Sequence, residues 1–492
     1  MISDSRRTTA RPNAERPDRP ERPDRPEDKA KLPDRPDRSK IDHDAPQRFK
    51  AVTRSNVNAT PEWESLDPEL RKGIEVVSAV LPFRTNRYVM EELIDWNAVP
   101  DDPIFRLTFP HRDMLSPEQF DRIQELLEGD DKAALDAAVR EIQLELNPHP
   151  AGQMTHNVPT VAGEPVPGIQ HKYDQTVLFF PAAGQTCHAY CTFCFRWAQF
   201  VGLDDMKFAN KDVEQLAGYL KEHPEVTDVL FTGGDPMVMR TKVFARYIDR
   251  ILEDPELAHV QTIRIGTKSV AYWPQRYVTD ADADDLLDCF RRIVDSGRTV
   301  AIMGHYSHPV ELSTPMAQEA VRRIRSAGAN IRMQSPLIRH VNDDANIWAE
   351  MWNTGVKLGC IPYYFFVERD TGARGYFETP LHKCHEIYRD AYQQVSGIAR
   401  TVRGPSMSAF PGKVHVLGVQ EVGGEKAFVL EYLQCRRGEL VRQPFFAKFD
   451  PEATWFDTLE PLTDRDKPFF PGSWDELTGE SEGTVPLIIS AD

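Results

Sequence analysis

The stretch Thr176-Val-Leu-Phe-Phe-Pro-Ala-Ala-Gly-Gln-Thr-Cys187-His-Ala-Tyr-Cys191-Thr-Phe-Cys194 contains the two features that decide the fold. Its first five residues are β-branched, aliphatic or aromatic, as expected of a buried strand. Three cysteines follow within a short loop. A strand that leads into a loop of reactive side chains is typical of parallel α/β proteins, in which the chemistry gathers at the carboxyl ends of the strands.

Five further β-rich runs follow this first one along the chain. They are Val229-Leu-Phe-Thr, Thr262-Ile-Arg-Ile, Thr299-Val-Ala-Ile-Met, Asn330-Ile-Arg-Met and Pro362-Tyr-Tyr-Phe-Phe-Val. Amphipathic helices separate them; the helix predicted from Pro315 to Ala327, for example, has Thr314 as its N-cap and Gly328 at its end. Six strand–helix units in succession predict an α/β fold, a partial (β/α)6 TIM-like barrel.

The rest of the chain differs in composition from this barrel region. An Arg/Pro/Asp-rich tract predicts a disordered tail over residues 1–45, because it offers nothing to bury. Residues 46–165 are expected to form a helical N-terminal subdomain; one of its helices begins at Pro117, with Ser116 as N-cap. The barrel is expected over 166–400, and a C-terminal extension over 401–492.

Overall composition limits the kind of protein. The 492 residues have 40% hydrophobic content, which suffices for a packed core, and a formal net charge of −17, which argues against duplex nucleic acid as a partner. We expect no membrane span and no signal peptide, since no apolar run approaches roughly 20 residues. Seven cysteines in so long a chain do not predict a disulfide framework, so a reducing cytoplasm is the expected location.

The three cysteines of the loop have the chemistry of metal ligands. They supply three thiolates where a 4Fe–4S cluster has four irons, which leaves one iron open to bind another molecule. Zinc is the alternative, but zinc sites usually add a second pair of Cys or His ligands, and the other cysteines here are scattered singly. The spacing therefore favours iron–sulfur.

The spacing C-x3-C-x2-C resembles the signature of radical S-adenosylmethionine (SAM) enzymes, and other motifs narrow this resemblance. From about Pro165 to about Gly418, roughly half of the sequence, the chain is similar to the lysine 2,3-aminomutase family of pyridoxal-phosphate (PLP)-dependent radical SAM enzymes. The motifs are Pro165-Val-Pro-Gly-Ile-Gln-His-Lys-Tyr, the cysteine loop, Phe231-Thr-Gly-Gly-Asp-Pro, Ile263-Arg-Ile-Gly-Thr, Pro274-Gln-Arg, His305-Tyr-Ser-His-Pro, Gln334-Ser, Val341-Asn-Asp, Pro362-Tyr-Tyr, Thr379-Pro and Pro411-Gly-Lys413.

The resemblance implies roles for individual residues. It makes Cys187, Cys191 and Cys194 the cluster ligands, and it makes Lys413 the catalytic lysine that holds PLP covalently. Gly233, Gly234 and Asp235 would contact SAM, His305 would lie near SAM, and Lys172 would contact the phosphate of PLP.

Substrate residues follow from the same resemblance. Arg196 matches the arginine that clamps the substrate carboxylate. Ser406 stands where lysine-specific members have an aspartate, and Glu368 or Asp370 would take the place of a second one. Arg369, between these two, would instead favour an acidic side chain, so the substrate is left open between lysine and another amino acid.

The leading interpretation is a radical SAM, PLP-dependent 2,3-aminomutase, which moves an amino group from Cα to Cβ of an α-amino acid. One alternative is a different radical step on the same barrel, with or without PLP; another is a degenerate cluster-binding or zinc-binding protein. The expected partners are a small amino-acid substrate and an electron donor such as flavodoxin or ferredoxin, with neither nucleic acid nor membrane. A homo-oligomer is left open.

Overall fold

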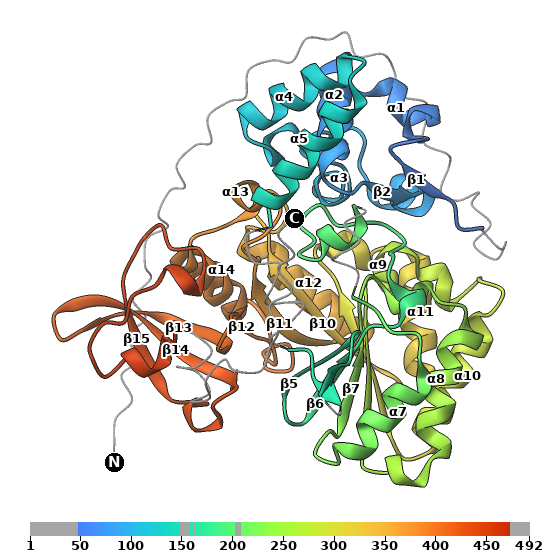
Figure 1. Cartoon of the computed structure of the whole chain (residues 1–492), viewed down its shortest axis with the longest axis vertical. Coiled ribbons are helices and arrows are strands. Elements are labelled where there is room, and N and C mark those ends of the chain that lie inside the picture. Colours follow the sequence, from blue (N-terminus) through green and yellow to red (C-terminus); the bar gives the residue numbers. More distant parts are fainter. Residues whose placement is uncertain (1–47, 148–156, 162, 202–207, 473–492) are drawn as a thin grey trace, which may run out of the picture. The chain divides into compact units, whose positions relative to one another are not determined.

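An eleven-stranded mixed sheet organises the protein, whose computed structural model describes residues 48–147, 157–161, 163–201 and 208–472 (Figure 1). The tail predicted at 1–45 lies outside these residues. All six predicted strands are present, and each runs parallel to the next. They are β6 (Thr176–Phe179), β7 (Asp228–Phe231), β8 (Thr262–Thr267), β9 (Thr299–His305), β10 (Asn330–Leu337) and β11 (Ile361–Val367).

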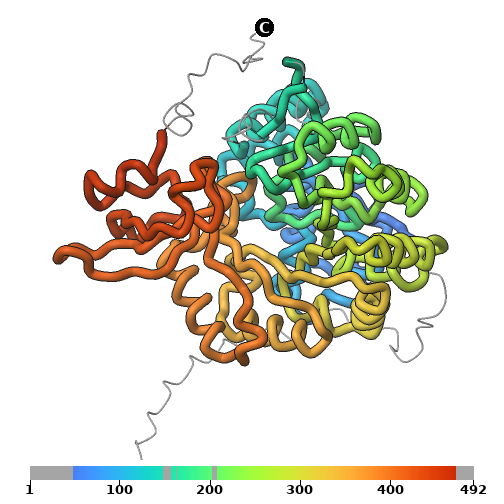
Figure 2. The backbone as a smooth tube through the Cα atoms, turned by 90° about the horizontal axis from the view of Figure 1, so that it is seen from below, coloured from blue at the N-terminus to red at the C-terminus, as the bar shows by residue number. Residues whose placement is uncertain are grey.

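The sheet extends beyond these six strands on both sides. Before β6 lies antiparallel β5 (Ile169–Tyr173); after β11 comes parallel β12 (Arg403–Ser408). The antiparallel strands β13 (Gly412–Val422), β14 (Glu425–Cys435) and β15 (Pro444–Lys448) follow, and they are orange to red in Figure 2. Because β5 and β15 form the two edges, the sheet of the described residues does not close on itself.

Helices connect the parallel strands, and α7, α8, α10 and α11 lie along one side of the sheet in Figure 1. None of the helices in the described ranges combines the length and the apolar character needed to cross a bilayer. The helices of this region are α7 (Val213–Glu222), α8 (Thr241–Glu253), α9 (Ser269–Tyr272), α10 (Ala283–Asp295), α11 (Pro315–Ser326), α12 (Ala345–Leu358), α13 (Arg374–Phe377) and α14 (Leu381–Gln393).

Helix α11 shows how local sequence sets an element. The Thr314 hydroxyl accepts a hydrogen bond from Ala317 N (3.0 Å), and Pro315 occupies the first turn, where no amide donor is needed. Its buried residues include Ala317, Ala320, Val321 and Ile324, which are three or four positions apart and so form one face. The helix predicted over Pro315–Ala327 is confirmed to within one residue.

The parallel strands have two different faces. Val177, Phe179, Val229 and Phe231 are fully buried, and Phe179 packs against the helical Tyr247 with ring centroids 5.1 Å apart. Alternate residues of the same strands line a cavity on the other face. Since successive side chains of a strand point to opposite faces, this alternation separates the core from the space available to a ligand.

The segment before the sheet is largely helical and supports the cysteine loop. Tyr190 N donates to Arg84 O (2.8 Å), and Thr192 N donates to Leu107 O (2.9 Å). The helix predicted at Pro117 is confirmed, with the Ser116 cap in place. The elements are β1 (Ala51–Thr53), α1 (Pro61–Ser65), α2 (Pro68–Val80), β2 (Arg84–Asn86), α3 (Pro103–Thr108), α4 (Pro117–Glu128), α5 (Lys132–Glu145) and a hairpin of β3 (Thr160–Val161) and β4 (Glu164–Pro165).

Candidate active site

The three cysteines of the loop follow β6 and are partly buried. Burial raises the pKa of the Cys191 thiol to about 12, although the charge of Lys268 opposes this rise. Burial also raises the pKa of Cys187 and of Cys194. Thiols with such pKa values stay protonated in the bare protein, and binding of a metal replaces the proton.

The Gly233–Gly234 pair packs directly against this loop. Gly233 has φ +138°, and a Cβ there would collide with the Gln185 side chain. A Cβ on Gly234 would lie 2.6 Å from backbone atoms of Thr186. Asp235 N donates to Thr186 O (2.7 Å). The two glycines are therefore required by contact between two loops of the chain itself.

The Asp235 carboxylate is bonded within the protein. One oxygen accepts from the Thr267 hydroxyl (2.6 Å) and Met237 N (2.9 Å). The other accepts from Lys268 N and Ser269 N, both at 3.0 Å. Burial raises the pKa of Asp235 to about 6 in spite of these bonds. Because its oxygens already have four donors, Asp235 holds the glycine turn in place and has little capacity for a direct ligand contact.

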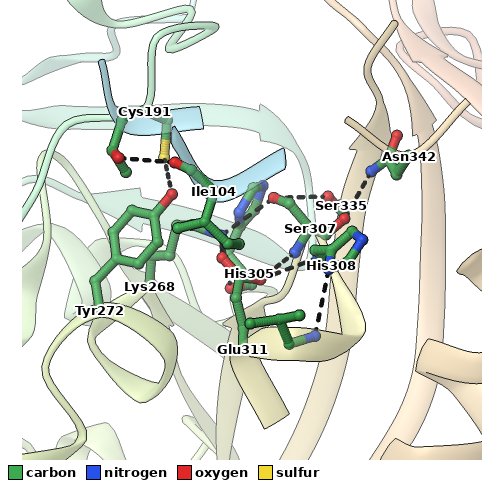
Figure 3. Close-up of polar contacts among 12 residues, drawn as sticks. Ile104, Cys191, Lys268, Tyr272, His305, Ser307, His308, Glu311, Ser335 and Asn342 are labelled. Carbon is green, nitrogen blue, oxygen red and sulfur yellow. Dashed lines mark hydrogen bonds and ion pairs between the residues drawn. The ribbon is translucent and has the colours of Figure 1, made fainter. Parts of the chain in front are cut away.

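A buried ion pair lies next to the cysteine loop (Figure 3). Lys268 Nζ is 2.7 Å from Glu311 Oε1 and donates to the Ser307 hydroxyl (3.1 Å). The same ammonium lies 4.5 Å from the centre of the Tyr272 ring, and Tyr272 Oη is 3.9 Å from Cys191 Sγ. The chain thereby keeps one positive charge close to a predicted cluster ligand.

The two histidines of the His305-Tyr-Ser-His308 motif have different surroundings. The His305 ring stacks on Phe193 of the cysteine loop, with centroids 5.8 Å apart, and its buried Nδ1 has no partner among the described residues. Burial, reinforced by Lys268, lowers the pKa of His305 well below its ordinary value. His308 instead accepts a hydrogen bond from Val310 N (3.4 Å) and caps a short helix. His305 is therefore the histidine available to a ligand.

A cavity of about 1390 Å³ lies on the open face of the sheet. Side chains from consecutive strands β6 to β13 form its wall, so this face of the sheet is concave. One such residue from each strand is Leu178, Leu230, Arg264, Met303, Arg332, Tyr364, Arg403 and Lys413.

Lys413 projects into this cavity over an aromatic ring. Its Nζ lies 4.2 Å from the centre of the Tyr364 ring. Burial lowers the pKa of Lys413 to about 7, and the positive charges of Arg264 and Arg403 contribute to this shift. An amine with a pKa near 7 is largely unprotonated at slightly alkaline pH, which is the form that reacts with an aldehyde.

A second lysine of the wall lies among other cations. Lys172 Nζ donates to Ala409 O (2.8 Å). Its pKa is well below the ordinary value because it is buried, and because Arg436, Arg369 and Lys413 add positive charge nearby. A cation in such surroundings is stabilised by an anionic ligand.

Arg196 contacts aromatic rings rather than acidic groups. Its guanidinium lies 4.4 Å from the centre of the Phe180 ring and 5.0 Å from that of Phe195. Burial lowers its pKa to about 10, and within the described ranges it forms no ion pair. Its polar edge is thus available to a carboxylate.

The wall of the cavity is strongly basic. It contains eight basic and three acidic residues, an excess of five basic residues in a chain whose net charge is −17. The basic residues are Lys172, Arg196, Arg264, Arg332, Arg369, Arg403, Lys413 and Arg436, and the acidic residues are Asp228, Asp370 and Asp457.

Sequence comparisons relate this site to known enzymes. A putative L-lysine 2,3-aminomutase of Aquifex aeolicus is 29% identical over 399 residues, which cover 81% of this chain and 93% of that protein. The L-lysine 2,3-aminomutase of Escherichia coli is 30% identical over 246 residues, which cover 49% of this chain and 67% of that protein. This chain belongs to the lysine 2,3-aminomutase family. Members of the family are isomerases, and this chain is an enzyme of that class.

Other comparisons with known proteins cover less of the relative or are weaker. The match to the L-lysine 2,3-aminomutase of Clostridium subterminale has 29% identity and covers 47% of this chain and 52% of that protein, so about half of that relative's length is matched. No protein-family model matches the chain. Among solved structures, a radical SAM methyltransferase from Sphaerobacter thermophilus has 16% identity and a TM-score of 0.34 over 48% of this chain and 68% of that one, which is a weak similarity.

The structure brings most residues predicted from the lysine 2,3-aminomutase family together in two places. Gly233, Gly234, Asp235 and His305 gather at the cysteine loop, and Lys172, Arg196, Asp370 and Lys413 lie on the cavity wall. Their roles toward ligands stay predictions.

Two predicted substrate residues do not line the cavity. Ser406 is fully buried, and its hydroxyl has no partner among the described residues. Glu368 is buried as well; burial and the nearby Asp370 raise its pKa well above the ordinary value, which favours the neutral form. Neither side chain offers a negative charge to a ligand in the cavity.

Sequence reasoning missed several residues of the wall, above all Arg264, Arg332 and Arg403. Two of them carried a signal, because Thr262-Ile-Arg-Ile and Asn330-Ile-Arg-Met each place an arginine inside a predicted strand. A charged residue in an otherwise buried strand has to face a solvated cavity or a partner.

Proposed function

We propose that the chain is a radical SAM, PLP-dependent 2,3-aminomutase that moves the amino group of an α-amino acid from Cα to Cβ. The observation that carries this proposal is Lys413, an amine of lowered pKa on the wall of a large basic cavity in a member of the lysine 2,3-aminomutase family. That cavity also contains Arg196, two residues after the last cysteine of the loop.

The cysteine loop fits a 4Fe–4S cluster. In the described ranges, no three His, Cys, Asp or Glu side chains are arranged to hold one metal ion, and this includes the three cysteines. A cluster instead takes one cysteine on each of three irons, so its thiolates stand apart. Cys187, Cys191 and Cys194 would hold it, and the cluster, once reduced, would supply the electron that cleaves SAM.

The cavity fits PLP. Lys413 would hold the cofactor, and the cations at Lys172 and Arg436 suit its phosphate. Tyr364, directly beneath the Lys413 amine, offers an aromatic face to the ring. Bound PLP would delocalise the unpaired electron of the substrate.

The chain's own residues would position the substrate and exclude water. Arg196 would bind the α-carboxylate through its planar fork, which the two phenyl rings keep in place. His305 would contact SAM beside the cluster. The backbone bonds from Arg84 and Leu107 would keep the cysteine loop closed against solvent.

We also propose an architecture for the strands around the cavity and partners for the enzyme. We infer that β6 to β11 form an incomplete (β/α)6 barrel, because one cavity is lined by all of them. The helical segment 46–165 and the extension 401–492 would be its attachments. A reducing cytoplasm and an electron donor such as flavodoxin or ferredoxin complete the proposal, and a homo-oligomer is left open.

Anaerobic turnover tests this function. Reconstituted protein, SAM, PLP and a chemical reductant are incubated with each of the common amino acids, and products are analysed for β-amino acids by chromatography and mass spectrometry. We expect a β-isomer of at least one amino acid, and its loss in both Cys191→Ala and Lys413→Ala. SAM cleavage without any β-isomer would instead support a different radical step on the same barrel.

A further inference from the structure

Three arginines form a group in the cavity that the proposed cofactors and the α-carboxylate do not use. Arg264, Arg332 and Arg403, here called the barrel arginines, come from β8, β10 and β12. They lie on strands far apart in the sequence, yet all of them face the cavity that contains Lys413. Their charges are separate from those of Lys172 and Arg436, which suit the PLP phosphate.

Two of the barrel arginines, Arg332 and Arg403, lie over tyrosine rings. The Arg403 guanidinium lies 4.4 Å from the ring centres of both Tyr363 and Tyr364. Arg332 lies 5.6 Å from the Tyr363 ring. Lys413 Nζ is over the same Tyr364 ring, at 4.2 Å, so the group adjoins the position at which a substrate would be attached.

Acidic partners are scarce around this group. Arg264 is paired with Asp228, since its Nε donates to Asp228 Oδ1 (2.8 Å). Arg332 and Arg403 form no ion pair among the residues that the structure describes, and each lies over an aromatic face. A cation–π contact stabilises a cation by about 0.5–2 kcal/mol, and it leaves the N–H groups of the guanidinium edge without acceptors.

The charges of the proposed ligands leave these arginines unmatched. The PLP phosphate brings about two negative charges and the α-carboxylate brings one. Lys172, Arg436 and Arg196 lie where these two anions are proposed to bind, so neither anion is left for Arg332 or Arg403. Lysine would add a further positive charge through its side-chain ammonium. A second carboxylate on the substrate would reduce the imbalance instead.

We propose that Arg332 and Arg403, supported by Arg264, bind the side-chain carboxylate of an acidic α-amino acid substrate. This inference rests on the proposed function and names its substrate class. The planar guanidinium edges of Arg332 and Arg403 provide paired donors for a carboxylate, while their faces stay stacked on the tyrosines. The substrate is then held at two ends, the α-carboxylate at Arg196 and the side-chain carboxylate at the barrel arginines.

The test compares pairs of ligands that differ in one charge. Equilibrium dialysis of the anaerobic holoenzyme with SAM measures the affinities for L-glutamate against L-glutamine, L-aspartate against L-asparagine, and L-lysine. We expect one acid to bind at least about tenfold more tightly than its amide, since hydrogen bonds between charged groups are stronger than neutral ones. This comparison needs no variant and does not depend on the folding of one.

Variants then assign the preference to the barrel arginines. Arg332→Met and Arg403→Met should each weaken binding of the preferred acid about 10- to 100-fold and leave binding of its amide unchanged. Arg246→Met is the matched control, because it removes one positive charge from an exposed position of α8. The control should bind as the wild type does.

Several outcomes would overturn the inference. Equal affinity for acid and amide, or tighter binding of L-lysine, would do so. Inorganic phosphate is measured as well. If it binds to the wild type but to neither variant, and no acid is preferred over its amide, the arginines bind a free anion and not the substrate side chain. Pyridoxal content is measured on the same samples, and its absence would contradict the proposed function. The acidic-substrate inference is tested by a different quantity, the ratio of acid to amide affinity, so the two failures can be told apart.

Discussion

At the scale of single residues, the environment of Lys413 changes what an ordinary lysine can do. Burial and two nearby arginines lower its pKa to about 7. At pH 8 such an amine is about nine-tenths neutral, whereas a lysine with the ordinary pKa would be less than about 1% neutral. The wall of the cavity therefore makes this amine reactive near neutral pH.

The rate of PLP attachment should follow this pKa. Raising the pH through 7 removes the proton from Lys413, so we expect the rate at which apoprotein binds PLP to rise from pH 6 to about pH 8 and then level off. Stopped-flow absorbance at the imine band measures it, with Lys413→Arg as the blank. A rate that still climbs at pH 10 would contradict the lowered pKa.

The buried pair of Lys268 and Glu311 makes a second prediction for single residues. The Glu311 side chain is fully buried and that of Lys268 is 10% exposed, so Lys268→Met leaves a buried carboxylate unpaired. We expect a loss of about 3–5 kcal/mol in the free energy of unfolding. Thermal melting followed by circular dichroism checks it.

The double variant Lys268→Met/Glu311→Gln is the control for this prediction. The glutamine is neutral and its amide oxygen still accepts from Ser307 N and His308 N, which now bond to Glu311. The double variant should therefore melt above the single one. Equal melting temperatures would show that the unpaired charge is not the cause.

Single residues also show where sequence reasoning stops. Lys413, Arg196 and Lys172, which the motifs singled out, all line one cavity, and their roles toward ligands stay predictions. The same motifs put Asp235 among ligand contacts, yet its carboxylate is occupied by four donors of the chain. Which atoms already have partners depends on tertiary packing, which no local pattern contains.

At the scale of elements, the six parallel strands and their helices could be predicted, but the C-terminal strands could not. Each parallel strand is a short apolar run followed by an amphipathic helix, which gives a repeated signal. Strands β13 and β14 mix polar and apolar residues and are joined by a tight turn at Gly423–Gly424. The alternation of strands and helices that identified the parallel strands ends before β13.

The N-cap of α11 predicts a stability effect for an element. The Thr314 hydroxyl accepts from Ala317 N and lies 2.6 Å from Tyr88 Oη, so it joins α11 to the N-terminal helical segment. Thr314→Ala removes both contacts and should lower the free energy of unfolding by about 1–3 kcal/mol. Urea denaturation measures this change.

Thr314→Ser keeps the hydroxyl and is the matched control. It should remain within about 0.5 kcal/mol of the wild type. If the serine and alanine variants were equally destabilised, the methyl group of Thr314 rather than its hydroxyl would be responsible.

At the scale of the whole molecule, charge is distributed unevenly. The chain carries a net charge of −17, while the cavity wall has five more basic than acidic residues. The composition of the sequence could not reveal this basic cavity, because the arginines of its wall are dispersed over strands β8, β10 and β12. Folding brings them together, and the cavity thereby favours anionic ligands inside an acidic protein.

The N-terminal tract makes a prediction for the whole chain. Its composition predicts that residues 1–45 contribute no buried apolar surface, so their deletion should leave the melting temperature within about 2 °C of that of the full chain. Iron content per protein should also be unchanged. A lower melting temperature together with lost iron would contradict the predicted boundary.

The measurement that tests the central claim most directly is borohydride reduction of anaerobically purified protein, followed by peptide mass analysis. A PLP-dependent aminomutase of this family should carry a pyridoxyl group on Lys413, while the neighbouring Lys172 of the same cavity should be unmodified. An unmodified Lys413 in protein that still holds its iron and cleaves SAM would contradict the claim and point to a radical reaction without PLP.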